Sequence, residues 1–183
     1  MAFDIRDANL ADIAAITAIY GEAVNHGSAS YELAAPDAAE MARRYQALVD
    51  KGYPYIVAVS ADATLLGYAY ASAFRTRPAY RWLVEDSIYL APEARGMGIG
   101  KALLNELVLR CASLGFRQMV GVVGGASPAS IAVHRSCGFE HAGRFTGTGF
   151  KHGTWLDTVF MQRPLGDGNA TPPDLGAYPG SMI

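Results

Sequence analysis

The residues best suited to binding a ligand form a glycine-rich segment in the middle of the chain. An apolar run ends at Leu90, a turn containing proline follows, and the chain then reads Arg-Gly-Met-Gly-Ile-Gly-Lys at residues 95–101. Glycines let a backbone approach a ligand closely, and the first N–H groups of a helix have no partners inside the helix. The helix dipole adds a positive potential, so the segment is suited to an anionic phosphate or pyrophosphate.

Other phosphate-binding motifs fit this segment less well. A Walker loop requires Ser or Thr after its lysine, and Ala102 stands there. A dinucleotide fingerprint has the spacing Gly-x-Gly-x-x-Gly early in the chain, with an acidic residue about 20 positions later. The glycine spacing differs here, and two helices are predicted ahead of the strand. A flexible turn into a helix is the remaining alternative, and the arginine and the strand-to-helix context favour a binding loop.

The composition limits what kind of protein this is. The chain has 183 residues, 51% of them hydrophobic and 17% charged, which predicts a single folded domain. Fifteen basic and 17 acidic residues argue against nucleic acid as a partner and favour a small-molecule ligand. Two cysteines and four histidines show no zinc spacing, so no metal is expected. No signal peptide and no apolar run of the ~20 residues that span a membrane are recognisable, which predicts a cytoplasmic protein.

Hydrophobic periodicity predicts the elements that must position the glycine segment. Apolar and polar residues alternate in the predicted strands, and apolar residues recur every three or four positions in the predicted helices. Strands are expected at 3–6, 55–59, 65–74, 83–90, 118–123, 143–150 and 154–161, and helices at about 9–26, 36–52, 99–114 and 127–137. The mixed order predicts an α+β sheet with helices on both faces. Residues 1–163 are expected to form the domain, and residues 164–183 a flexible tail rich in proline and glycine.

Several segments together resemble a known family. Residues 95–100 resemble the coenzyme A pyrophosphate loop, Arg/Gln-x-x-Gly-x-Gly/Ala, of the GNAT superfamily of N-acetyltransferases. Residues 84–90, 130–139 and 149–157 resemble the branch that acetylates phosphinothricin and methionine sulfone or sulfoximine. The resemblance covers residues 3–163. It implies a GNAT-like mixed, mostly antiparallel sheet, acetyl-CoA as co-substrate and direct attack of an amine on the thioester, for which no metal is needed.

Glu85 is the first candidate for a catalytic base. An amine that is mostly protonated at neutral pH needs a group to take its proton. In a regular strand Glu85 shares a face with Ser87 and Tyr89, opposite Asp86, and the resemblance implies that it is the base. The alternative is a surface carboxylate at the end of a strand.

His134 is the second catalytic candidate. The resemblance places it where GNAT enzymes reprotonate the leaving thiolate, and a histidine can supply a proton near neutral pH. A packed core histidine is the open alternative. Cys137 lies at helical spacing from His134 without a base partner, which favours core packing over a nucleophile.

The resemblance also implies a set of contacts to the coenzyme. Backbone groups near Tyr89 and Leu90 would bind the acetyl oxygen and the pantetheine arm. Ser127 stands where the family usually has an asparagine, and a serine offers only one hydroxyl in place of the amide. The residues expected to bind the coenzyme are Ile88, Tyr89, Leu90, Arg95, Gly96, Met97, Gly98, Ile99, Gly100, Lys101, Ser127 and Ser136.

A separate group of residues is expected to bind the amine. Guanidinium groups bind carboxylate and phosphinate oxygens through two bonds, so Arg75 and Arg81, beside Phe74, are candidates. A solvated basic loop is the alternative. The resemblance implies that Tyr31 and Glu32 cover the pocket. The expected substrate-binding residues are Tyr31, Glu32, Phe74, Arg75, Arg81 and Lys151, of which Lys151 could equally be an ordinary turn lysine.

These observations lead to one hypothesis and two alternatives. The hypothesis is N-acetylation of the α-amino group of a small amino acid such as phosphinothricin, methionine sulfone or methionine sulfoximine, by a protein that the resemblance implies is a homodimer. An N-acetyltransferase for another primary amine (an antibiotic, a polyamine or a peptide N-terminus) is one alternative. A non-catalytic sensor that binds acyl-CoA is the other.

Overall fold

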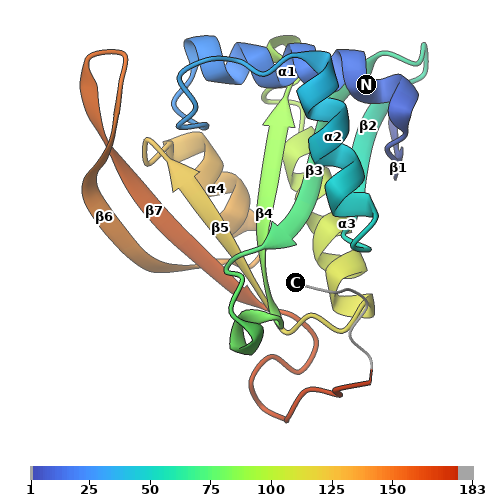
Figure 1. The fold of residues 1–183 in the computed structure, drawn as a ribbon, viewed down its shortest axis with the longest axis vertical. Helices are drawn as coiled ribbons and strands as arrows, with labels where there is room; N and C mark the ends of the chain where they lie inside the picture. The colour runs from blue at the N-terminus through green and yellow to red at the C-terminus, as the bar shows by residue number, and fades with distance from the viewer. Residues whose placement is uncertain (1, 177–183) are drawn as a thin grey trace.

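The computed structural model describes residues 2–176, and its centre is one twisted sheet (Figure 1). In this part of the chain seven strands lie in the order β1-β2-β3-β4-β5-β7-β6, and every neighbouring pair is antiparallel except β4 and β5. The strands are β1 (Phe3–Asp7), β2 (Tyr55–Ser60), β3 (Leu65–Ala73), β4 (Leu83–Leu90), β5 (Gln118–Gly124), β6 (Glu140–Lys151) and β7 (Thr154–Pro164). The expected mixed, mostly antiparallel α+β sheet is confirmed.

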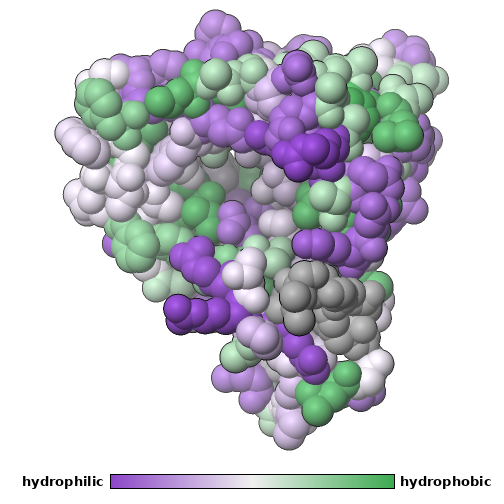
Figure 2. All heavy atoms as spheres, viewed as in Figure 1, coloured by the Kyte–Doolittle hydropathy of each residue, from purple (hydrophilic) through white to green (hydrophobic). Residues whose placement is uncertain are grey.

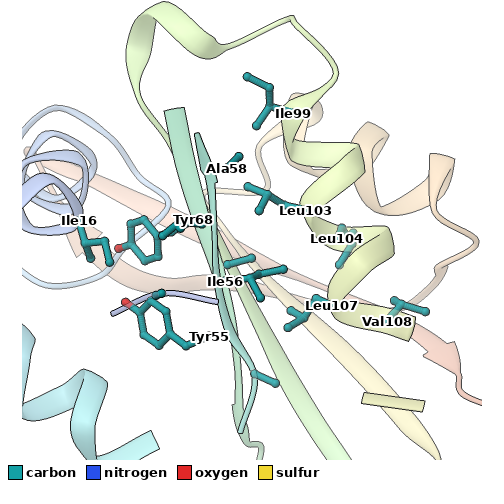
Figure 3. Close-up of a cluster of buried hydrophobic side chains, with 14 of the residues drawn as sticks. Ile16, Tyr55, Ile56, Ala58, Tyr68, Ile99, Leu103, Leu104, Leu107 and Val108 are labelled. Carbon is teal, nitrogen blue, oxygen red and sulfur yellow. The ribbon is translucent and has the colours of Figure 1, made fainter. Parts of the chain in front are cut away.

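Two helices cover each face of the sheet. They are α1 (Ile13–His26) and α2 (Ala38–Val49) on one face, and α3 (Ile99–Ser113) and α4 (Pro128–Ser136) on the other, with short 3-10 turns at Leu10–Asp12, Pro78–Tyr80 and Pro92–Ala94. Figure 3 shows Ile16 and Tyr68 on the α1 side of the strands and Leu103 and Leu107 on the α3 side. Side chains of a strand alternate between faces, so the two cores use alternate residues of the same strands.

The core beneath α1 and α2 is built from stacked tyrosines. The register pairs Tyr55 with Tyr70 and Tyr68 with Tyr89, which places their rings on one face. The ring centroids of Tyr55 and Tyr70 are 4.9 Å apart, and Tyr20 of α1 meets Tyr89 edge-on, also at 4.9 Å. In β4, Tyr89, Ser87 and Glu85 therefore face α1 and α2, and the residues between them face α3 and α4.

The segment after β7 differs from the sequence prediction. A flexible tail was expected from Pro164 onward, but Leu165 is only 1% exposed and its N–H donates to the carbonyl of Arg117. The Arg117 side chain also donates to the carbonyls of Gly168 and Thr171. The predicted boundary is wrong for this stretch because one buried leucine and one arginine attach it to the end of α3 and the start of β5. Residues 177–183 of the predicted tail lie outside the described residues.

Candidate active site

The site begins where β4 and β5 separate. The parallel ladder runs from Leu83–Gln118 to Asp86–Gly121 and stops there, whereas β4 remains paired with β3 as far as Leu90. Backbone groups of residues 87–90 on the β5 side therefore face a gap rather than a neighbouring strand. A strand edge that opens inside a sheet offers hydrogen-bonding groups to an extended ligand.

A cleft of about 760 Å³ occupies this gap. Its walls come from the end of α1 and the following loop (residues 27–31), from β4 (residues 85–90), from the tip of β5 (residues 122–124) and from the first turns of α4. Figure 2 shows the molecular surface hollowed below α1, between β4 and the β6–β7 hairpin. Tyr70 and Thr158, which the sequence analysis did not single out, also line the cleft.

The glycine segment lies at one end of the cleft. Gly98 is the N-cap of α3 with φ +81°, and Gly96 has φ +77°. A Cβ at either position would meet no heavy atom within 4 Å, so glycine is favoured by the backbone conformation and not by crowding. Arg95, Gly96 and Gly100 line the cleft, and with the N-terminus of the 15-residue α3 they make a cationic site that fits a diphosphate.

The other residues expected to bind the coenzyme are placed differently from one another. Ile88, Tyr89 and Leu90 line the cleft through β4. Ser127 also lines it, and its Oγ accepts a hydrogen bond from the N–H of Ser130, which caps α4. Five residues of the predicted set do not line the cleft: Met97, Gly98, Ile99, Lys101 and Ser136. The Ser136 hydroxyl instead donates to the carbonyl of Val133.

Glu85 lies in the wall of the cleft at the point where the strands separate. It is paired with Ser72 on β3 and is partly buried. Burial, and then the negative charge of Asp86, raise the pKa of Glu85 to about 7, and the positive charge of Arg75 opposes them. A carboxyl with this pKa changes its proton occupancy at neutral pH, which is the property required of a general base.

His134 meets a partner that the sequence analysis missed. Its Nε2 lies 3.1 Å from Oδ1 of Asp86, its Nδ1 lies 2.8 Å from the carbonyl oxygen of Ser130, and both side chains are buried at the edge of the cleft. Burial alone would lower the pKa of His134, but the hydrogen bond and charge of Asp86 raise it overall. The signal was present in the sequence: of two adjacent carboxylates on a buried strand, one must face the opposite core and needs a partner there.

Tyr31 lines the cleft and connects the loop after α1 to β7 and to the end of β5. Its hydroxyl donates to the carbonyl of Asp157 at 2.9 Å, lies 2.8 Å from Oγ1 of Thr158 and accepts from the N–H of Gly125 at 3.3 Å. A Cβ at Gly149 would come within 2.8 Å of the Tyr31 ring. The Tyr31 ring therefore packs closely between the loop after α1 and the β6–β7 hairpin.

Glu32 and Lys151 hold the same loop without lining the cleft. Lys151 is 4% exposed, and its Nζ donates to the carbonyl of Ser30 at 2.7 Å. Glu32 accepts from the hydroxyl of Tyr20 at 2.9 Å and pairs with Arg44 at 2.6 Å. Burial lowers the pKa of Lys151, and the charge of Glu32 opposes this effect. Both side chains have structural partners in this arrangement.

The predicted arginines lie beyond the end of β3. The guanidinium of Arg75 lies 4.5 Å from the ring centroid of Phe74, and that of Arg81 lies 4.5 Å from the ring of Trp82. None of Phe74, Arg75 and Arg81 is among the residues that line the cleft. Arg75 is nevertheless close enough for its charge to lower the pKa of Glu85, which places it on the Glu85 side of the site.

Comparison with known proteins decides the family. A model of the acetyltransferase (GNAT) domain matches residues 5–160, which is most of the chain. The chain belongs to the GNAT acetyltransferase family. The predictions of family, fold class and enzyme class are therefore confirmed. The separation of β4 from β5 and the glycine segment at the start of α3 line the same cleft.

Named relatives and solved structures agree with this assignment. The chain is 48% identical to phosphinothricin N-acetyltransferase of Alcaligenes faecalis, across 89% of this chain and 83% of that protein. It is 37% identical to the L-methionine sulfoximine/L-methionine sulfone acetyltransferase of Pseudomonas paraeruginosa, across 94% of this chain and all of that protein. A GNAT phosphinothricin acetyltransferase from Sinorhizobium meliloti, solved in complex with AcCoA, matches with a TM-score of 0.96 at 61% identity, across 98% and 97% of the two chains.

Residues 2–176 lack two further features. No group of three or more His, Cys, Asp or Glu side chains in this range is arranged to hold a metal ion. No helix in the same range is both long and apolar enough to cross a membrane.

Proposed function

We propose that this acetyltransferase moves the acetyl group of acetyl-CoA to the α-amino group of a small amino acid of the phosphinothricin, methionine sulfone or methionine sulfoximine type. The names of the relatives support this substrate class. The observation that carries the proposal is Glu85, a carboxyl with a pKa of about 7 in the wall of a cleft whose other end is a phosphate-binding helix terminus.

The coenzyme is bound mainly by backbone groups. The diphosphate lies at the start of α3 beside Arg95, and the pantetheine arm enters the gap along residues 87–90. An N–H group of β4 near Tyr89 or Leu90 donates to the acetyl oxygen, where negative charge develops during the reaction. Binding in this place puts the thioester next to Glu85.

The reaction requires two proton removals and one proton return. Glu85 takes a proton from the ammonium of the substrate, directly or through water, and the amine nitrogen then attacks the thioester carbon. The C–S bond breaks with its electron pair on sulfur, and the second nitrogen proton is released. His134 supplies a proton to the thiolate, and the proton taken up by Glu85 returns to His134 through solvent, so that the products are the amide, free CoA and one proton released to solvent.

The amine is held between the loop after α1 and the end of β3. Tyr31 lines this part of the cleft, and Glu32 and Lys151 fix the loop that carries it. Arg75, Arg81 and Phe74 are proposed to bind the acidic end of the substrate once it occupies the site, because a guanidinium pairs with carboxylate and phosphinate oxygens. The charge of Arg75 already acts on Glu85.

We further propose that the protein is a cytoplasmic homodimer. The β6–β7 hairpin extends from the body of the molecule (Figure 1). It carries three exposed aromatic side chains, Phe145, Phe150 and Trp155. The ring centroids of Phe150 and Trp155 are 5.2 Å apart. Exposed apolar clusters of this kind mark interaction surfaces.

Cys111 and Cys137 are free buried thiols, which suits a reducing compartment. Light scattering on the purified protein gives the oligomeric state, and a monomer would contradict the proposal.

The function is tested by following thiol release from acetyl-CoA with each candidate amino acid and with polyamine, antibiotic and peptide amines. The proposal expects turnover with the amino acids and a value of kcat/KM that rises through about pH 7, as Glu85 loses its proton. Glu85→Gln should lower kcat by about a hundredfold or more while acetyl-CoA still binds by calorimetry. Turnover only with another amine overturns the substrate class. Binding of acetyl-CoA without turnover in the unmodified protein identifies a sensor instead.

A further inference from the structure

Asp86 takes no part in the proposed reaction. It forms the last rung of the β4–β5 ladder with Gly121, and it directly follows Glu85 but faces the opposite side of the sheet. Its side chain is 2% exposed. Oδ1 pairs with His134, and Oδ2 is buried with no hydrogen-bond partner among the described residues. An ionised carboxylate is costly to bury, so the position of Asp86 where β4 and β5 separate requires an explanation.

Gly121 makes room for this pair. A Cβ at Gly121 would lie 2.3 Å from Nε2 of His134 and 3.2 Å from Oδ2 of Asp86. The edge of the Phe139 ring packs on the imidazole from another side, with ring centroids 5.1 Å apart. The imidazole is therefore held between β4, β5 and the start of β6 in a single orientation.

The hydrogen bonds define the charge of the ring. Both nitrogens face acceptors, a carboxylate at Nε2 and the carbonyl of Ser130 at Nδ1. A neutral imidazole carries a proton on only one nitrogen and would leave one of these acceptors without a donor. An imidazolium donates to both. The geometry thus favours a buried Asp86–His134 ion pair.

We propose that Asp86 is a positioning residue that prepares both proposed catalytic groups at once: its negative charge keeps His134 protonated on one face of the sheet and discourages ionisation of Glu85 on the other. This proposal rests on the proposed function, because it assigns a purpose to the states of Glu85 and His134. Asp86 itself transfers no proton.

The neighbouring charges are consistent with this role. Burial and then the charge of Asp86 raise the pKa of Glu85. At His134 burial lowers the pKa, and the hydrogen bond and charge of Asp86 together with the bond to Ser130 outweigh it. Around Glu85, the charge of Arg75 acts in the opposite direction, and burial raises the pKa of the Tyr70 phenol above its ordinary value. Around the ion pair, the thiols of Cys111 and Cys137 have a pKa raised by burial, so both are uncharged at neutral pH.

The test is Asp86→Asn, which keeps the shape and a hydrogen bond to His134 but removes the charge. We expect kcat to fall by about tenfold or more, since loss of one charge at a catalytic site costs at least about one pKa unit of stabilisation. Both limbs of the pH profile should move to lower pH, the acidic limb because Glu85 ionises more easily and the basic limb because His134 loses its proton more easily. The KM for acetyl-CoA should stay within about twofold.

A matched control and a second measurement keep the test decisive. Asp62→Asn, in the exposed turn between β2 and β3, should leave the pH profile unchanged. In the unmodified protein, the nitrogen chemical shifts of His134 by NMR should be those of an imidazolium at neutral pH, and those of a neutral ring in Asp86→Asn. A neutral His134 in the unmodified protein, or an unshifted pH profile in the variant, overturns the proposal. If no amine is acetylated, the proposed function fails, whereas the NMR result still decides whether Asp86 holds the charge.

Discussion

The two walls of the cleft are built in different ways. One wall, which we call the coenzyme wall, consists of residues 87–100, a continuous stretch from β4 into α3. The other, the amine wall, brings residues 27–31 together with residues 149–158. The bonds that join its parts link Ser30 to Lys151 and Tyr31 to Asp157 and Thr158, positions more than a hundred residues apart.

The two walls also differ in the groups that they present to the cleft. The coenzyme wall offers backbone N–H groups at a helix terminus, and glycines set its shape locally. The amine wall offers side chains whose positions depend on long-range hydrogen bonds, each of which contributes on the order of 1 kcal/mol. A change in the first wall should therefore affect acetyl-CoA, and a change in the second should affect the amine.

Of the changes that test one wall at a time, the largest effect is expected from adding a side chain to the coenzyme wall. Gly98→Ala forces an alanine to φ +81°, which costs about 1–2 kcal/mol and displaces the start of α3. We expect the KM for acetyl-CoA to rise by about tenfold, with the KM for the amine unchanged at saturating acetyl-CoA.

The matched control for this variant is Gly143→Ala on β6. An added Cβ meets no heavy atom within 4 Å at either position, and only Gly98 has a positive φ. Equal effects of the two substitutions on acetyl-CoA binding would show that the helix terminus is not the coenzyme site.

The amine wall is tested by Tyr31→Phe. The variant loses a hydroxyl that contacts Asp157, Thr158 and Gly125, which loosens the loop after α1. We expect the KM for the amine to rise about threefold to tenfold and that for acetyl-CoA to stay the same. Tyr45→Phe is the control, because its hydroxyl donates to the carbonyl of Ala8, away from the cleft. A change of both KM values in Tyr31→Phe would mean that the walls are not independent.

Glu85, where the walls meet, makes stability depend on pH. Its pKa is raised from 4.5 to about 7 in the folded state, so the folded state binds more protons than the unfolded state between these values. The resulting stabilisation of the folded state is fully present below pH 4.5, the pKa of the unfolded state, and is lost as the pH rises through about 7, the pKa of the folded state. Glu85→Gln should therefore be more stable than the unmodified protein at about pH 8, by on the order of 2 kcal/mol, and show less advantage at about pH 5. Urea unfolding at both pH values measures this, and an equal difference at both would contradict it.

The smallest effect is expected at Lys151, behind the amine wall. Burial lowers its pKa, so the unfolded state binds more protons and stability should increase as the pH rises through the folded pKa towards the ordinary value. Lys151→Met should abolish this increase and, by freeing the carbonyl of Ser30, raise the KM for the amine about twofold to threefold. Lys51→Met, at an exposed position, is the control. If stability still increases with pH in Lys151→Met, the increase comes from another titrating group.

The sequence predicted the local shape of the coenzyme wall better than the contacts of the amine wall. Residues 95–101 carry their own geometry, because glycines and a helix start act over a few positions, and the alternation of β4 predicted the face on which Glu85 lies. Glu32 and Lys151 were expected to contact the amine, and their partners turn out to be other parts of the protein. Tail residues near Leu165 were expected to be mobile because proline and glycine content does not reveal a single buried leucine.

The order of strands and helices, the family and the glycine-rich start of α3 were determined by the sequence alone, since all of them depend on periodicity and on short motifs. The tertiary structure decided that β4 leaves β5 after Asp86, that Asp86 meets His134 of α4, and that Tyr31 reaches Thr158. These contacts join segments distant in the chain, and local preferences of the backbone carry no information about which distant side chain will be the partner.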